Sequence, residues 1–196
     1  MADADEHRFA LHGVPWSAYS ALRDALDGHS SLKMTCLNGA LELMRPSRLH
    51  AETAAVIARL IEVWAMEHDA DLRGFGGATF RREAKERGLE PDERYKLGEL
   101  RDDGVPDIAI EVIVTSALVD TMAVYAGLGV AEVWVWRPTI ATLAVHRLVG
   151  DRYELRERSA VLPALDVSAL ARFVQPGQNQ TALAKAYQAS LRAPAR

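Results

Sequence analysis

The sequence predicts a single α/β domain, because strand and helix patterns alternate along a chain of 196 residues in which no long linker separates them. Residues 107–114 read DIAIEVIV and are almost continuously apolar and β-branched, which is typical of a central strand buried on both faces. Residues 118–128 follow with a helical pattern closed by Gly129, and residues 132–136 return to a strand pattern. The hydrophobic content of 49% is enough for one core.

The N-terminal third is expected to hold a helix, a β-hairpin and a second helix. Residues 16–26 place apolar side chains at helical spacing. Residues 32–44 form two short apolar segments joined by Asn38-Gly39, the strongest two-residue hairpin signal. Ser47 can cap the next helix, whose apolar residues repeat with helical period as far as His68. We expect this helix to lie on a sheet.

Weaker patterns predict the remaining elements. The charged residues 81–88 are expected to form a solvated loop, and Asp92 opens a short segment next to the central strand. Strands are expected at 72–75, 79–82, 142–148 and 152–155, and helices at 167–173 and 181–191.

The composition limits the classes of function. The first residues are charged and no run of about 18 apolar residues exists, so we expect a cytoplasmic protein without a membrane span. The single cysteine, Cys36, cannot form an internal disulfide and is expected to be buried. The net charge of -4 argues against a protein that coats nucleic acid by bulk attraction, although it is compatible with a local basic groove.

Glu111 stands inside the apolar central strand, where an ionised side chain is costly unless a cation, a proton or a partner accompanies it. Alternation along the strand places Asp107 and Glu111 on one face. A hard divalent cation would satisfy such carboxylates. The alternatives are an edge strand with Glu111 facing solvent, or an ion pair with an arginine such as Arg94.

The order of several short motifs resembles the Uma2 family of the PD-(D/E)XK nuclease superfamily. The resemblance extends over residues 38–148 and is most specific at 107–136. Its motifs are Gly39 to Met44, Pro46-Ser47, His50, Glu90-Pro91-Asp92, Pro106 to Val112, Asp120, Tyr125, Gly129-Val130 and Glu132-Val133-Trp134.

The resemblance implies one restriction-endonuclease-like domain over residues 1–196, with a mixed central sheet flanked by helices. In that fold an aspartate and a glutamate on neighbouring strands hold Mg²⁺ or Mn²⁺, which activates water for attack on a phosphodiester. Asp92 matches the aspartate position and Glu111 the glutamate position, both as metal ligands. Glu42 matches an upstream acidic position of the catalytic site, where we expect it to complete the metal shell or to order a water, and we expect His50, one helical turn beyond the Ser47 cap, to approach the same site.

One position departs from the family. The superfamily lysine would stand at Ile113, and Uma2-like sequences carry it instead on the following helix, where this chain has Thr121. Because that lysine stabilises the anionic transition state, its loss implies slow cleavage. The leading hypothesis is therefore a magnesium-dependent endonuclease acting on nucleic acid, expected to be DNA, as a homodimer. The alternatives are an inactive nuclease fold that binds nucleic acid or a protein partner, and an oligomer scaffold.

The same residues also have purely structural interpretations. Asp92 after a proline is typical of a turn, and Glu42 between two leucines is typical of the solvent face of a hairpin. His50 is typical of a helix surface or cap. Trp134 and Trp136 share one face of a strand, which favours a core or a dimer interface over a base-stacking platform.

Overall fold

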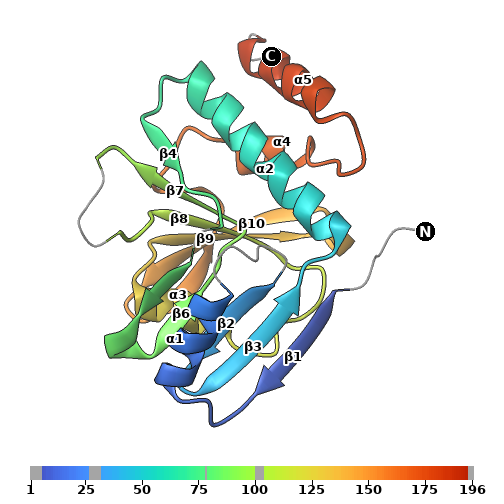
Figure 1. Cartoon of the computed structure of the whole chain (residues 1–196). Helices are drawn as coiled ribbons and strands as arrows, with labels where there is room; N and C mark the ends of the chain where they lie inside the picture. Colours follow the sequence, from blue (N-terminus) through green and yellow to red (C-terminus); the bar gives the residue numbers. More distant parts are fainter. Residues whose placement is uncertain (1–5, 27–31, 78, 100–103, 194–196) are drawn as a thin grey trace.

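The protein contains two β-sheets with helices packed on them (Figure 1). The structure is a computed structural model of the whole chain that describes residues 6–26, 32–77, 79–99 and 104–193. Its N-terminal elements are β1 (His7–Leu11), α1 (Trp16–Ala25), β2 (Lys33–Leu37), β3 (Ala40–Arg45) and α2 (Arg48–Glu67). The central elements are β4 (Leu72–Gly74), β5 (Phe80–Arg82), η1 (Glu83–Lys85), β6 (Arg87–Leu89), β7 (Glu93–Leu97), β8 (Ile108–Val112) and α3 (Thr121–Leu128). The C-terminal elements are β9 (Glu132–Arg137), η2 (Pro138–Ile140), β10 (Thr142–Val149), β11 (Arg152–Arg156), α4 (Val167–Ala171) and α5 (Gln180–Arg192).

The larger sheet has the strand order β11-β10-β9-β8-β7-β4 and is mixed. Strands β8 and β9 are parallel and are connected through α3, whereas the other neighbours in this sheet pair antiparallel. Strand β8 lies in the interior of the sheet, with β7 and β9 on its two sides. The expected central strand and its neighbour near Asp92 are therefore confirmed, and so is the mixed sheet.

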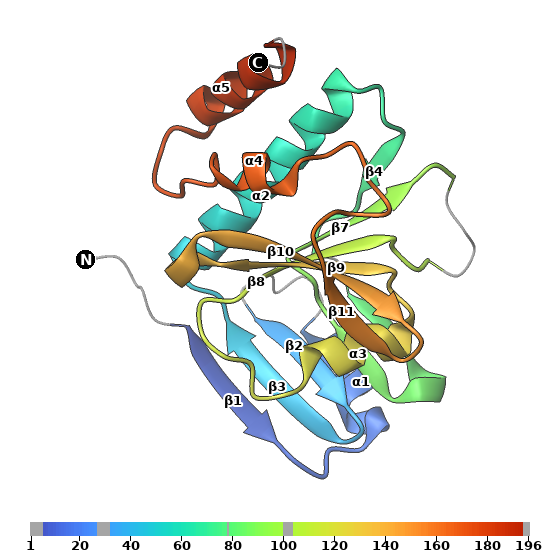
Figure 2. The same ribbon diagram turned by 180° about the vertical axis from the view of Figure 1, so that it is seen from behind.

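The two faces of this sheet are covered by different parts of the chain. Ile108, Ile110 and Val112 pack with α2 in the main core, to which Trp134 and Trp136 also belong. Ala109 and the valines of β9 pack instead against α3. Figure 1 and the reverse view in Figure 2 show α2 on one side of the sheet, and α3 with the smaller sheet on the other. Glu111 thus lies on the side that faces α3 and the smaller sheet.

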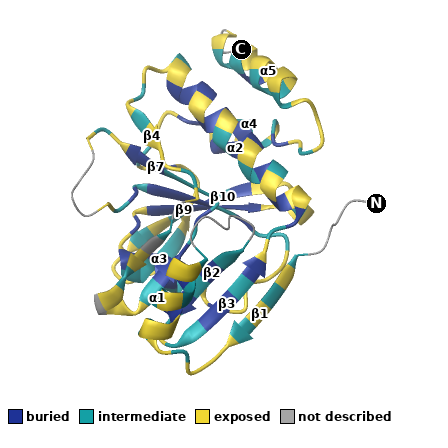
Figure 3. Cartoon of the chain, viewed as in Figure 1, coloured by how far each residue is buried: buried dark blue, intermediate teal, exposed yellow. Residues whose placement is uncertain are grey.

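The smaller sheet is antiparallel and has the strand order β1-β3-β2-β6-β5. Its core is formed by Tyr19 of α1 with Met34, Cys36 and Leu41. In the view coloured by burial, the buried residues concentrate where the two sheets and α2 meet (Figure 3). Burial of Cys36, of which 1% is exposed, agrees with the expectation from the sequence.

The predicted hairpin and helix cap are confirmed. Asn38 and Gly39 both have positive φ angles, 47° and 83°, as a two-residue hairpin turn requires. The Ser47 hydroxyl accepts a hydrogen bond of 3.2 Å from the His50 backbone N–H, so it caps α2. At the other end of the chain, α5 is fastened to α2 because Arg192 Nε donates to Glu67 at 2.6 Å.

Two expectations for local structure were wrong. Residues 81–88 are not a solvated loop, since they contain parts of β5, η1 and β6, and Gly88 of β6 pairs with Cys36 of β2. The charge of this segment is accommodated because Arg87 donates to the Ala123 carbonyl of α3 at 2.9 Å. The helix expected from residue 118 begins only at Thr121, because Asp120 caps it through the Ala123 N–H at 3.0 Å.

The sequence patterns also gave no strand before residue 16, whereas β1 pairs with β3 along its whole length. Among the helices that the structure describes, none is both long enough and apolar enough to span a bilayer.

Candidate active site

Asp92 and Glu111 are brought together by neighbouring strands. The Asp92 N–H donates to the Ile110 carbonyl at 3.1 Å, and the Asp92 carboxylate accepts from the Val112 N–H at 2.6 Å. Asp92 is thereby fixed to β8 on both sides of Glu111, just before β7 begins. The Asp92 side chain is 2% exposed, which excludes the interpretation as a surface turn residue.

Glu111 lies between the fully buried residues Ile110 and Val112, and its carboxylate accepts a short hydrogen bond from the Tyr125 hydroxyl of α3. Strand β8 is not an edge strand, so the solvent-facing alternative is excluded. Burial, together with the negative charge of Asp92, raises the pKa of Glu111 well above its usual range. A cation placed between the two carboxylates would relieve this repulsion.

Lys33 reaches the same place from the smaller sheet. Its ammonium group donates to Asp92 Oδ1 in a short ion pair, and to the Glu90 carbonyl at 3.3 Å. Burial raises the pKa of Asp92, but the charge of Lys33 and the hydrogen bond from His50 outweigh it and hold that pKa far below the usual range. Lys33 was not among the site residues predicted from the sequence. Two signals pointed to it: the chain has four lysines in all, and the alternation in β2 buries Met34 and Cys36 and turns Lys33 to the opposite face.

His50 joins the site from the first turn of α2. Its Nε2 lies 2.6 Å from Asp92 Oδ1 and its Nδ1 lies 2.5 Å from Glu6 Oε1. Burial by itself lowers the pKa of His50, but the hydrogen bonds with Asp92 and Glu6 outweigh it and raise the pKa to about 9. The structure therefore brings the predicted supporting histidine into contact with Asp92, as an imidazolium held between two carboxylates.

Glu42 is buried, not solvent-facing, and its carboxylate binds the loop that precedes α3. One carboxylate oxygen forms a short ion pair with Arg8, and the other accepts from the backbone N–H groups of Leu118 and Val119. Both oxygens thus already have donors. Glu42 fixes the entrance of α3, and through it the position of Thr121.

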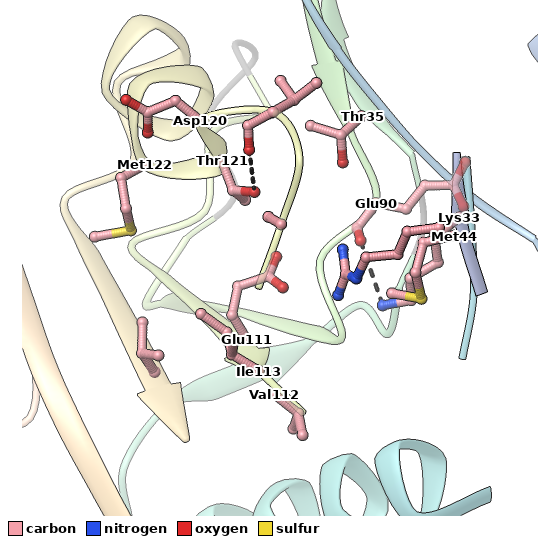
Figure 4. A pocket seen from close by; sticks show the side chains of 14 residues that line it. Lys33, Thr35, Met44, Glu90, Glu111, Val112, Ile113, Asp120, Thr121 and Met122 are labelled. Carbon is pink, nitrogen blue, oxygen red and sulfur yellow. Dashed lines mark hydrogen bonds between the residues drawn. The ribbon is translucent and has the colours of Figure 1, made fainter. Parts of the chain in front are cut away.

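Thr121 is the first residue of α3, and its hydroxyl donates to the Val119 carbonyl at 3.3 Å. It lines a pocket of about 230 Å³ together with Lys33 and Glu111, which Figure 4 shows from close by. The pocket lies between the two sheets. Its lining residues are Arg8, Lys33, Thr35, Met44, Glu90, Glu111, Val112, Ile113, Ala117, Val119, Asp120, Thr121, Met122 and Val135.

Other predicted contacts lead away from this pocket. Asp107, expected on the face of Glu111, precedes β8 and pairs with Lys96 at 2.7 Å. Arg94 lies over the ring of Phe75, with its guanidinium carbon 5.5 Å from the ring centre. Neither Lys96 nor Arg94 is among the residues that line the pocket.

Two carboxylates are ligands that a hard divalent ion prefers, but both oxygens of Asp92 already accept hydrogen bonds, one from Lys33 and His50 and the other from the Val112 N–H. In the described part of the chain no group of three or more histidine, cysteine, aspartate and glutamate side chains is arranged to hold a metal. Mg²⁺ nevertheless commonly binds through one or two carboxylates, with water and substrate phosphate oxygens completing its shell. Asp92 and Glu111 supply two such carboxylates. A cation bound beside Glu111 would stabilise its ionised form and lower its raised pKa.

Comparison with known proteins gives one family. The model of the Uma2 family, described as "Putative restriction endonuclease", matches residues 16–183. Among solved structures, the chain is similar to a protein from Anabaena variabilis ATCC 29413 described as a "putative nuclease belonging to DUF820". The two share 13% identity with a TM-score of 0.47, over 72% of this chain and 91% of the other. A search of curated proteins finds no match.

Proposed function

Because this chain belongs to the Uma2 family, we propose that it is an endonuclease that hydrolyses phosphodiester bonds of nucleic acid, with DNA as its substrate. Its proposed cofactor is Mg²⁺ or Mn²⁺, with Asp92 and Glu111 as the protein ligands. When bound, such an ion neutralises charge on the phosphate and makes a coordinated water more acidic.

The observation that carries this proposal is the pairing of two buried carboxylates beside one pocket: Glu111 lines the pocket, and Asp92 contacts Lys33, which also lines it. Asp92 is fixed to β8 by the Val112 N–H, and Glu111 is held by Tyr125 from α3. Buried carboxylates that repel each other destabilise a fold unless cations offset them. Lys33 and His50 already offset the charge of Asp92, but burial and Asp92 still raise the pKa of Glu111, and this supports a function that depends on an added cation.

The chain's own residues would divide the work of the reaction. Asp92 and Glu111 bind the ion, and Tyr125 keeps the Glu111 carboxylate turned toward the pocket. His50 contacts Asp92 and is itself held by Glu6, so the two residues orient the Asp92 carboxylate. Lys33 and Arg8 are the two cations of a pocket lining that also carries Glu90, Glu111 and Asp120, so a metal ion bound at the carboxylates would be needed to favour entry of a phosphate.

Thr121 favours a second candidate, an inactive nuclease fold that binds nucleic acid or a protein partner without cutting. Helix α3 reads TMAVYAGL and contains no lysine, so the charge that Uma2-like sequences place there is missing from it. On this alternative the protein retains DNA in the presence of the ion but leaves it intact.

Cleavage of supercoiled plasmid in Mg²⁺ and in Mn²⁺ tests the proposal. Asp92→Asn and Glu111→Gln should each lower the rate by ~100-fold or more, because loss of the ion removes several kcal/mol of transition-state stabilisation. Asp107→Asn is the matched control, since it neutralises a carboxylate beside the same strand that pairs with Lys96 and not with a residue of the pocket lining. Calorimetric titration with Mn²⁺ should show weaker binding in the two site variants and unchanged binding in the control.

Three results would contradict the proposal: cleavage that persists in EDTA, cleavage that survives both site variants, or no cleavage at all. DNA retention without cleavage would instead support the binding-only alternative. We also propose that the protein acts as a homodimer, since two related sites suit the two strands of a duplex.

A further inference from the structure

We propose that Lys33 supplies the active-site positive charge that Uma2-like sequences place on α3. This inference rests on the proposed nuclease function. It assigns the role of the missing α3 lysine to a residue on β2 of the smaller sheet. Its basis is the contact of Lys33 with Asp92 and its position on the pocket lining with Glu111 and Thr121.

The other lysines are committed elsewhere. The chain has four, Lys33, Lys85, Lys96 and Lys185. Lys85 donates to the Gly127 carbonyl at 2.5 Å and Lys96 pairs with Asp107 at 2.7 Å. Lys185 lies exposed on α5, which packs on α2. Lys33 is the lysine that contacts one of the two proposed metal ligands.

The fold of the hairpin directs Lys33 into the pocket. It is the first residue of β2, and Met34 and Cys36 fill the core under α1. Because side chains alternate along a strand, Lys33 and Thr35 share the opposite face, and both line the pocket. The side chain of Lys33 is 17% exposed, so it is largely buried beside Asp92 while it still lines the pocket.

Lys33 and Thr121 line the same pocket, Lys33 from β2 and Thr121 from α3. Figure 4 shows Lys33 entering from the smaller sheet and Thr121 from the start of α3, with Glu111 between them in this view. A lysine on either element would place its ammonium group in one pocket of about 230 Å³. A charge at the pocket, not at a particular sequence position, is what an anionic transition state requires.

In the hydrolysis, water oxygen bonds to phosphorus while the bond from phosphorus to the leaving sugar oxygen breaks. The hydroxyl of the water stays on phosphorus, and its other proton passes to the leaving oxygen. Lys33 keeps its protons throughout and donates hydrogen bonds to the phosphate oxygens, on which negative charge increases. A neutral side chain of similar length at position 33 would occupy the same space but would not stabilise the anionic transition state.

The test compares wild type with Lys33→Met, Lys33→Arg and the double variant Lys33→Met with Thr121→Lys. Plasmid cleavage should fall ~100-fold in Lys33→Met, stay within about tenfold of wild type in Lys33→Arg, and recover at least ~10-fold in the double variant. Lys185→Met, which removes an exposed lysine far from the pocket, should cleave like wild type.

A readout besides activity separates a catalytic role from a structural one. Lys33 competes with any cation at Asp92, so Lys33→Met should bind Mn²⁺ at least as tightly as wild type while it cleaves more slowly. Circular dichroism and thermal unfolding confirm that each variant is folded, and Lys33→Gln replaces Lys33→Met if the methionine variant is not.

The two proposals fail in different ways. Wild-type cleavage that Glu111→Gln abolishes but neutral Lys33 variants retain would overturn the role of Lys33 and leave the nuclease function standing. Loss of cleavage accompanied by equal loss of Mn²⁺ affinity would make Lys33 a structural residue. A wild type that never cleaves would overturn both.

Discussion

The buried imidazolium of His50 predicts a specific dependence of stability on pH. The His50 pKa rises from 6.5 to about 9 in the fold, because hydrogen bonds with Asp92 and Glu6 outweigh the effect of burial. At about 1.4 kcal/mol per pKa unit, a shift of this size corresponds to about 3 kcal/mol of folding free energy. His50 is almost completely buried, so solvent screening reduces this figure little.

The sign follows from the direction of the shift. A group whose pKa is higher in the folded than in the unfolded state contributes its full stabilisation below the unfolded pKa. For His50 the contribution is complete below pH 6.5 and is lost as the pH rises through about 9. We therefore expect the free energy of unfolding of wild type to decrease over this interval.

Urea unfolding of wild type and His50→Gln, followed by tryptophan fluorescence in EDTA, measures this contribution. The free energy of unfolding of wild type should exceed that of His50→Gln most at about pH 6. This difference in free energy should shrink by about 3 kcal/mol by about pH 10. His7→Gln is the matched control, because His7 is exposed on β1, and it should change stability at neither pH. A difference between wild type and His50→Gln that is the same at every pH would refute the assignment of an imidazolium to His50.

Two further predictions concern the fold and the assembly. Glu132→Ala should destabilise the protein by about 3 kcal/mol or more in chemical denaturation, because the Trp134 indole, the Ser159 hydroxyl and the Ala160 N–H all donate to this buried carboxylate and would lose that acceptor. Sedimentation at micromolar concentration should give twice the protomer mass of 21.5 kDa if the protein is a homodimer, whereas a single species of 21.5 kDa would argue against it.

Local sequence patterns were sufficient to predict the elements that depend on residues close to them in the chain. The continuous apolar run of β8 predicts a strand covered on both faces, and the structure covers it with α2 and α3. Asn38-Gly39 and Ser47 specify a turn and a cap through their own backbone chemistry, independently of the rest of the fold. Such features depend on neighbours within a few residues, which a single sequence contains.

The parts that were missed depend on how the two sheets meet. Alternation in β2 shows that Lys33 faces away from Met34, but not that another sheet covers that face. Lys33 and Asp92 are separated by 59 positions, and Glu6 and Thr115 by 109. Charged residues do not by themselves indicate exposure to solvent. Arg87 donates to a carbonyl on α3, and Glu42 accepts from N–H groups in the loop before α3. Periodicity gives the direction of a side chain, and only the tertiary arrangement gives its partner.

The contacts of Asp92 connect the stability of the site with its proposed chemistry. Its carboxylate is matched by two cations, Lys33 and His50, and by the Val112 N–H. A divalent ion at Asp92 would add two positive charges, so one of the present cations must give way. His50 is held at both ring nitrogens and is buried, whereas Lys33 has a flexible stem, and its side chain is partly exposed on the pocket lining. Lys33 would therefore be the cation displaced from Asp92, and on the pocket lining it would then donate to the oxygens of a bound phosphate.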